Sequence, residues 1–93
     1  MNINQIEEGN RGYFVATENS VEVGRITYVM AGPTKLVIEH TEVNPTYEGN
    51  GIGKKLVFAT VDYARENNLK ILPLCTFAKA LFDKTPEIHD VLF

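Results

Sequence analysis

The spacing of hydrophobic and polar positions changes near the middle of the chain. Up to Val43, β-branched and aromatic residues are dense, and they predict strands over Gly12–Asn19, Val21–Ala31 and Lys35–Val43. The connections Glu18-Asn19-Ser20 and Gly32-Pro33-Thr34 are short, so these strands should run antiparallel. Asn2 to Glu7 is a further candidate for an edge strand.

After the glycines near residue 50, the apolar positions take a helical period. One stripe is formed by Ile52, Leu56, Ala59, Thr60 and Tyr63, and is widened by Val57, Val61 and Ala64. It predicts a helix over Gly51–Asn67. The apolar segment Leu69–Leu74 then suits a buried strand, and Phe77–Lys84 a second helix that Thr85-Pro86 closes. The sequence therefore predicts an α+β domain: an antiparallel meander, then helix, strand and helix in one mixed sheet.

Length and composition indicate a single soluble domain spanning residues 1–93. The net charge of -3 and pI near 5.3 argue against nucleic-acid binding. The N-terminus lacks the basic start and apolar run of a signal peptide, and no window approaches the roughly 18 apolar residues of a membrane span. We therefore expect a cytoplasmic protein. Cys75 is the single cysteine, which excludes an internal disulfide and a cysteine-based zinc site, and no metal site is expected.

The stretch Thr46–Lys55, TYEGNGIGKK, lies directly before the predicted helix. Main-chain N–H groups in the first turn of a helix bind anions, and glycines let a ligand approach them. The alternative is an ordinary tight turn between strand and helix. Gly53 favours the ligand, because a glycine within the first helical turn costs about 1 kcal/mol relative to alanine and the turn does not need it. Something should lie close to Gly53.

Two familiar phosphate loops do not fit this stretch. A P-loop needs a glycine five residues before Gly53 and Ser or Thr after Lys54, whereas the chain has Glu48 and Lys55. The dinucleotide fingerprint needs G-x-G-x-x-G in an early βαβ unit, whereas these glycines are spaced two apart after an antiparallel meander.

The segment Glu48-Gly49-Asn50-Gly51-Ile52-Gly53 resembles the R/Q-x-x-G-x-G/A signature of the GNAT superfamily of acyl-CoA-dependent N-acetyltransferases. The resemblance covers about Lys35 to Lys84. It implies a GNAT-like fold and an acetyl-CoA (coenzyme A) ligand, with its pyrophosphate on the N–H groups from Gly49 to Lys54. It also implies that the edge from His40 to Val43 pairs with the pantetheine arm and that the Val43 amide polarises the acetyl carbonyl. The expected cofactor-binding residues are Thr41, Val43, Glu48, Gly49, Asn50, Gly51, Ile52, Gly53, Lys54, Lys55 and Lys79.

A second motif of the same family matches with departures. Family members carry Asn, Ala, Tyr and Lys after their fifth strand, and this chain has Cys75, Ala78, Phe82 and Lys84 at those spacings. Phe82 replaces the tyrosine that often protonates the leaving thiolate, and Glu48 stands where Arg or Gln is usual and is expected to point outward. Compared with the family, the sequence is also expected to lack helices before the meander and strands after the second helix. It therefore resembles a short, truncated subgroup.

Two residues of the fourth predicted strand are candidate general bases. Unless a bulge intervenes, one face carries Leu36, Ile38, His40 and Glu42, and the other carries Val37, Glu39, Thr41 and Val43. His40 and Glu42 would then converge on the cofactor end, where a base for an amine is wanted. The alternative is that they are solvated strand-edge residues. His89, in an acidic tail, is expected to be a surface residue.

Cys75 is the candidate nucleophile. It falls at the end of a predicted buried strand and the start of a helix, where the helix dipole favours a thiolate that could accept an acetyl group. The alternative is a small buried hydrophobe. Lys79, one helical turn on, could hold the thiolate or a phosphate, while Lys54 and Lys55 are better placed for phosphates.

These features together predict an acetyl-CoA-binding N-acetyltransferase that acts on an unknown amine or protein acceptor. Transfer would be direct, with Glu42 or His40 as the base, or would pass through Cys75. A non-catalytic module that binds or senses acyl-CoA is the alternative, and a protein-interaction domain that keeps the fold is another. The protein is expected to be a monomer or a homodimer.

Overall fold

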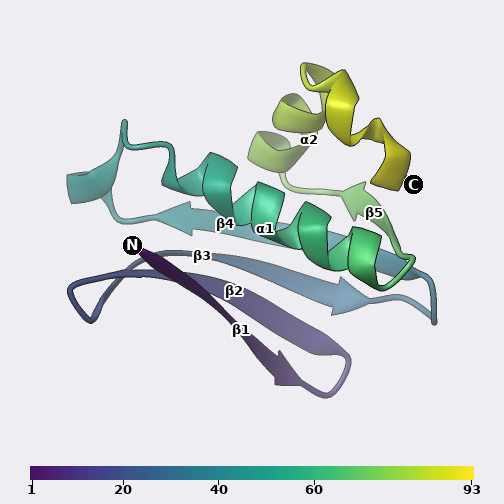
Figure 1. The fold of residues 1–93 in the computed structure, drawn as a ribbon, viewed down its shortest axis with the longest axis horizontal. Coiled ribbons are helices and arrows are strands. Elements are labelled where there is room, and N and C mark those ends of the chain that lie inside the picture. The colour runs from purple at the N-terminus through teal and green to yellow at the C-terminus, as the bar shows by residue number, and fades with distance from the viewer.

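The computed structural model describes residues 1–93 and confirms the α+β prediction. Five strands form one sheet in the order β1-β2-β3-β4-β5, antiparallel throughout except for the parallel pair β4 and β5 (Figure 1). The elements are β1 (Asn2–Glu8), β2 (Arg11–Glu18), β3 (Val21–Met30), β4 (Lys35–Val43), the short 3-10 helix η1 (Pro45–Tyr47), α1 (Ile52–Glu66), β5 (Lys70–Pro73), α2 (Thr76–Asp83) and the 3-10 helix η2 (Pro86–Val91).

The predicted elements are all present, with ends shifted by a few residues at most. The candidate edge strand is real, because β1 pairs with β2 along its whole length. The hairpin between β2 and β3 turns through Asn19 and Ser20, whose φ angles of 50° and 66° give the left-handed pair typical of tight hairpins. The sequence did not indicate the two 3-10 helices.

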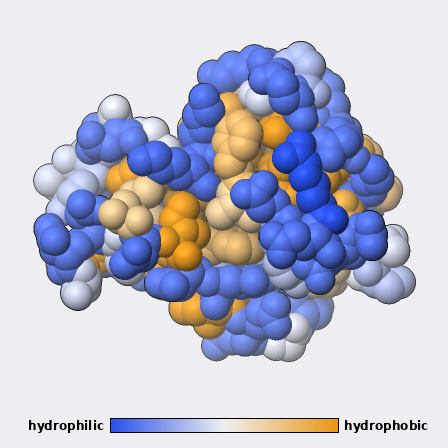
Figure 2. Space-filling model, viewed as in Figure 1, coloured by the Kyte–Doolittle hydropathy of each residue, from blue (hydrophilic) through white to orange (hydrophobic).

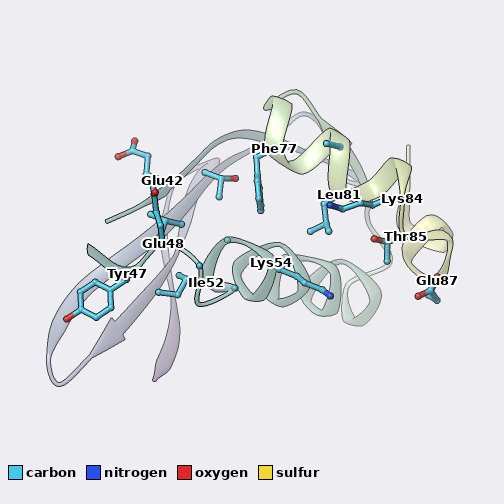
Figure 3. A pocket seen from close by; sticks show the side chains of 16 residues that line it. Glu42, Tyr47, Glu48, Ile52, Lys54, Phe77, Leu81, Lys84, Thr85 and Glu87 are labelled. Atoms are coloured by element: carbon cyan, nitrogen blue, oxygen red, sulfur yellow. The ribbon is translucent and has the colours of Figure 1, made fainter. Parts of the chain in front are cut away.

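Both helices cover the same face of the sheet, and the core lies between them and the strands (Figure 1). Most of the stripe on α1 is buried as predicted, while Ala59 and Tyr63 are partly buried. The stripe packs on sheet residues that include Ile26, Leu36, Ile38 and Ile71, all fully buried. Thr60 is the buried polar member of the stripe, and its hydroxyl donates to the Leu56 carbonyl at 3.0 Å. The space between α1 and α2 opens as a cleft in which apolar side chains are exposed (Figures 2 and 3).

The opposite face of the sheet carries no helix and is covered by its own side chains. Arg11 forms an ion pair with Glu39 there. Arg25 is paired with Glu22 at 2.8 Å, and its guanidinium lies 4.9 Å from the centre of the Tyr13 ring. These long side chains shield apolar residues of the strands. No helix of the structure is both long enough and apolar enough to cross a membrane.

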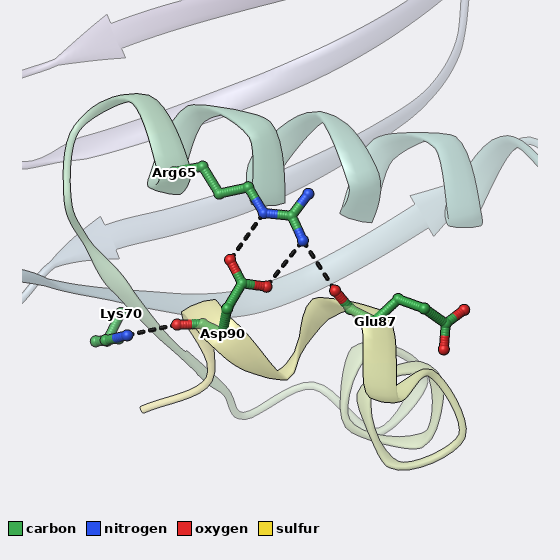
Figure 4. Close-up of polar contacts among 4 residues, drawn as sticks. All are labelled: Arg65, Lys70, Glu87 and Asp90. Carbon is green, nitrogen blue, oxygen red and sulfur yellow. Dashed lines mark hydrogen bonds and ion pairs between the residues drawn. The ribbon is translucent and has the colours of Figure 1, made fainter.

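The C-terminal segment is tied to α1 and to β5. Arg65 donates to both carboxylate oxygens of Asp90, at 2.9 and 2.8 Å, and to the Glu87 carbonyl at 2.9 Å, while Lys70 donates to the Asp90 carbonyl (Figure 4). Leu92 then forms a parallel bridge with Ile71. The tail therefore packs against β5 at the edge of the sheet.

His89 is exposed, as expected, but it also closes α2. Its Nε2 lies 2.6 Å from the Phe82 carbonyl near the end of that helix, so the ring is a second donor to a carbonyl that also accepts from the Thr85 N–H at 3.2 Å.

We expect replacement of Arg65 by alanine to raise the pKa of Asp90. The hydrogen-bonded Arg65 guanidinium holds the pKa of this exposed carboxyl below its usual value of about 4. A lowered pKa in the folded state adds stability above the ordinary pKa, and this stability is lost as the pH falls through the lowered value. NMR titration of the Asp90 carboxyl carbon measures the pKa directly.

Arg25→Ala is the matched control, since it breaks the equivalent pair with Glu22 and should leave the Asp90 pKa unchanged. An Asp90 pKa that stays low in Arg65→Ala would show that the guanidinium is not its cause.

Candidate functional site

The sheet splits between its two parallel strands. β4 has nine residues and β5 only four, so β5 pairs with Lys35 to Ile38 and with nothing beyond. The Leu74 N–H donates to the Ile38 carbonyl at 3.0 Å as the last main-chain bond between the two segments. From Glu39 to Val43, β4 therefore has a free edge on this side.

A bulge in β4 changes which side chains face the helices. Thr27 of β3 pairs with His40 and Tyr28 pairs with Ile38, so Glu39 has no partner across the ladder. Beyond the bulge, Thr41 and Val43 pair with Ile26 and Gly24 and lie on the helix-covered face. His40 and Glu42 lie on the bare face, and of these two only Glu42, near the end of the strand, also borders the cleft. The predicted grouping of Leu36 and Ile38 with His40 and Glu42 is wrong for this reason.

The loop before α1 leaves a run of main-chain donors free. Gly49 and Gly51 have φ angles of 88° and 71°, and a Cβ at either position would meet no atom within 4 Å. They are glycines because of their backbone conformation. Gly51 is the N-cap of α1, no side chain caps the helix there, and its first turn has no acidic residue. The N–H groups from Gly49 to Lys54 find no acceptor in the protein.

A helix start with free N–H groups and no cap is a site for an anion. The groups carry the positive end of the helix dipole, and a bound anion supplies the acceptors that the chain withholds. Asn50 stabilises the loop from within, because its side-chain amide donates to the Tyr47 carbonyl at 2.9 Å.

An open cleft of about 1020 Å³ begins at this loop and runs between α1 and α2 (Figure 3). Its charged side chains are Lys54 and Lys84, with Glu42, Glu48 and Glu87. Of the residues predicted for the site, the cleft brings together Thr41, Glu42, Val43, Glu48, Gly49, Gly51, Ile52, Gly53 and Lys54.

The remaining predicted residues do not line the cleft. Lys55 and Asn50 line a smaller cavity of about 470 Å³ beside Glu18. Lys79 is exposed and forms an ion pair with Asp83 at 3.1 Å, so it is not placed to hold a ligand in the cleft. His40 is exposed on the bare face, outside the cleft.

Cys75 lies between β5 and α2, as the sequence predicted, and is the N-cap of α2. Its Sγ accepts from the Ala78 N–H at 3.3 Å and lies 3.3 Å from the Thr41 hydroxyl. The residue is half-buried and does not itself line the cleft, whereas its neighbour Thr41 does. The thiol therefore has polar neighbours. Phe82, which stands at the family's tyrosine position, is only 1% exposed and belongs to the core.

The close neighbour of Gly53 is a protein side chain. A Cβ at Gly53 would lie 2.8 Å from Cζ and 3.0 Å from Cε2 of Phe77. The expectation that something lies close to Gly53 is confirmed, and the neighbour is the aromatic ring of Phe77 in α2.

Tyr47, which directly precedes Glu48, also lines the cleft. The sequence analysis left out six further cleft residues: Phe77, Ala80, Leu81, Lys84, Thr85 and Glu87. Lys84 was recognisable, since it stands at the family's lysine spacing. The others gave no signal, because α2 approaches α1 only through the tertiary fold.

Comparison with known proteins identifies the family. The family model described as GCN5-related N-acetyl-transferase matches residues 12–91. A GCN5-like protein from Staphylococcus aureus is 38% identical and has a TM-score of 0.72, over 97% of this chain and 87% of that one. A search of curated proteins finds no match.

Two more distant structures share the fold. Tetrahymena GCN5 is 20% identical with a TM-score of 0.70, over 83% of this chain, which spans only 51% of that protein. The aminoglycoside N-acetyltransferase AAC(6')-Iy, solved in complex with CoA, is 12% identical with a TM-score of 0.68, over 88% of this chain and 87% of that one. The family model spans residues 12–91, and the Staphylococcus aureus protein is 38% identical over 97% of this chain. The chain therefore belongs to the GCN5-related N-acetyltransferase family.

Proposed function

We propose that the protein binds acetyl-CoA in the cleft and transfers its acetyl group to an amine or protein acceptor through Cys75. The run of free N–H groups from Gly49 to Lys54 carries this proposal, because it offers a diphosphate the donors it needs. The binding of CoA by an aminoglycoside acetyltransferase of the same fold supports the choice of ligand.

The N–H groups must supply most of the affinity for phosphate. Lys54 and Lys84 add positive charge to the cleft, but Glu42, Glu48 and Glu87 add more negative charge. A diphosphate held directly on the first turn of α1 gains from the helix dipole regardless of this balance. The free edge of β4 from His40 to Val43 would pair with the amides of the pantetheine arm, much as a strand adds to a sheet.

Cys75 would act as the nucleophile. Its sulfur attacks the thioester carbonyl carbon of acetyl-CoA, a new S–C bond forms, and the old one breaks to release the coenzyme as a thiolate. The thiol proton passes to that leaving thiolate. The Ala78 N–H donates to the sulfur and the Thr41 hydroxyl lies 3.3 Å from it, and both contacts would orient the sulfur for attack.

The acceptor amine would then attack the acetyl group on Cys75 and restore the thiol. Glu42 is the better candidate to take the amine proton, since it lines the cleft and His40 does not. Direct attack on acetyl-CoA with Glu42 as the base uses the same residue. The two routes differ in whether Cys75 becomes acetylated.

A binding module without turnover is the second candidate. The observation that favours it is the burial of Phe82, since the position where relatives carry a tyrosine acid offers no proton here. Acetyl-CoA binding without transfer to polyamines, lysine peptides or small amines would establish this role.

We expect Gly51→Glu to weaken acetyl-CoA binding by at least about tenfold, measured by calorimetry. The new side chain brings a negative charge to the N-cap position, where the diphosphate would lie. Gly9→Glu is the matched control, because Gly9 has a similar φ of 65° and equally open surroundings, but lies in the β1–β2 turn away from the cleft. Equal affinities for the two variants would contradict the proposed diphosphate site.

We expect incubation with acetyl-CoA to add the mass of one acetyl group to the protein, and Cys75→Ser to lose this adduct. Thr41→Val should slow its formation by about tenfold, since one hydrogen bond to the sulfur is removed. Thr27→Val, on the bare face, is the control and should react at the wild-type rate. A protein that binds acetyl-CoA but forms no adduct in a single turnover would remove the Cys75 route and leave direct transfer.

A further inference from the structure

Phe77 is a large apolar side chain of the cleft to which the proposed function gives no role. It is the second residue of α2, it is 45% exposed, and it projects from α2 toward the first turns of α1 (Figure 3). In that view Glu42, Glu48, Tyr47 and Ile52 lie on one side of the ring, and Lys54, Leu81, Lys84, Thr85 and Glu87 lie on the other. An exposed aromatic ring inside a concave site is typical of ligand contact.

The ring is seated on the main chain of α1. The reason for a glycine at Gly53 differs from the reason at Gly49 and Gly51, which have positive φ angles and open space around them. Gly53 is helical, and a Cβ there would collide with the tip of the Phe77 ring. Gly53 weakens the helix relative to alanine, and its missing Cβ leaves room for the Phe77 ring.

Phe77 spans the distance between the two ends of the proposed reaction site. Its main chain is two residues from Cys75, and the tip of its ring contacts Gly53, within the run of free N–H groups. The ring therefore lies between those N–H groups and the turn that carries Cys75.

We propose that Phe77 determines specificity for the acyl donor by packing against the chain that links its thioester to its diphosphate, and that Gly53 seats the ring. This inference rests on the proposed function. It defines the donor as a molecule with a long, partly apolar linker and disfavours small acyl donors such as acetyl phosphate. The ring adds contact area only for ligands that carry the linker.

The test compares CoA with ADP, which carries a diphosphate and nucleotide but no linker. Calorimetry gives the Kd for CoA, and NMR chemical-shift titration into the millimolar range gives the Kd for ADP. Phe77→Ala should raise the Kd for CoA by about five- to tenfold and leave the Kd for ADP nearly unchanged. Leu74→Ala is the matched control, since Leu74 is 63% exposed and close in sequence but does not line the cleft.

Gly53→Ala tests the seat of the ring. Its Cβ displaces the ring, so the Kd for CoA should rise in the same selective way. In the Gly53→Ala/Phe77→Ala double variant the ring that the new Cβ would displace is absent, so the two changes together should weaken CoA binding by less than the sum of their separate effects. The alanine at position 53 should raise the Tm above that of Phe77→Ala, because alanine favours a helix more than glycine does.

The outcomes separate the two proposals. A wild-type protein that does not bind CoA contradicts the proposed function itself. If the wild type binds CoA and Phe77→Ala binds it equally well, only the role of Phe77 is overturned. Equal weakening of CoA and ADP also overturns it, since the ring would then act by holding α2 against α1. If Phe77→Ala fails to fold, Phe77→Leu keeps most of the apolar volume without the flat ring and should show a smaller loss for CoA alone.

Discussion

The early end of the pairing between β4 and β5 determines the shape of the site. Once the Leu74 N–H has bonded to the Ile38 carbonyl, the two strands part. The chain then turns at Cys75 into α2, which begins at Thr76, while β4 continues to Val43. Because the strands separate, the edge of β4 is free, Cys75 lies beside Thr41, and the start of α2 faces the start of α1. A longer β5 would remove the free edge of β4, the contact between Cys75 and Thr41, and the approach of α2 to α1.

The first turn of α1 lacks the residues that normally stabilise the start of a helix. A side-chain cap such as Ser or Asp is usually worth about 1 kcal/mol, yet Gly51 provides none, and the first turn carries no acidic residue. Gly53 adds a second weak helix former. Burial of the stripe stabilises α1 along its length, and the ion pair between Arg65 and Asp90 stabilises its C-terminal end. The helix can therefore remain folded without a cap at its start.

The fold was largely predictable because its determinants are local. Periodicity in the two halves gave the strands, the helices and their order, and even the weak pattern of Asn2 to Glu7 is a strand. The bulge at Glu39 was not predictable in position, since alternation continues through it in the sequence, and it moved His40 and Glu42 to the bare face. The loop from Glu48 to Lys54 was recognisable from its glycines. Phe77 was not, because only packing of α2 on α1 brings it to Gly53.

The contacts of Cys75 are a better guide to whether its role is structural or chemical than its position in the sequence is. A cysteine that serves only as a small hydrophobe is normally buried among apolar side chains, where its thiol makes no polar contact. Cys75 touches the core but is half-buried, and both the Ala78 N–H and the Thr41 hydroxyl lie against its sulfur. These two contacts hold the sulfur in a fixed position on the side of α2 that faces β4. The bulge also contributes here, because without it Thr41 would point to the bare face and leave the sulfur with the helix N–H alone.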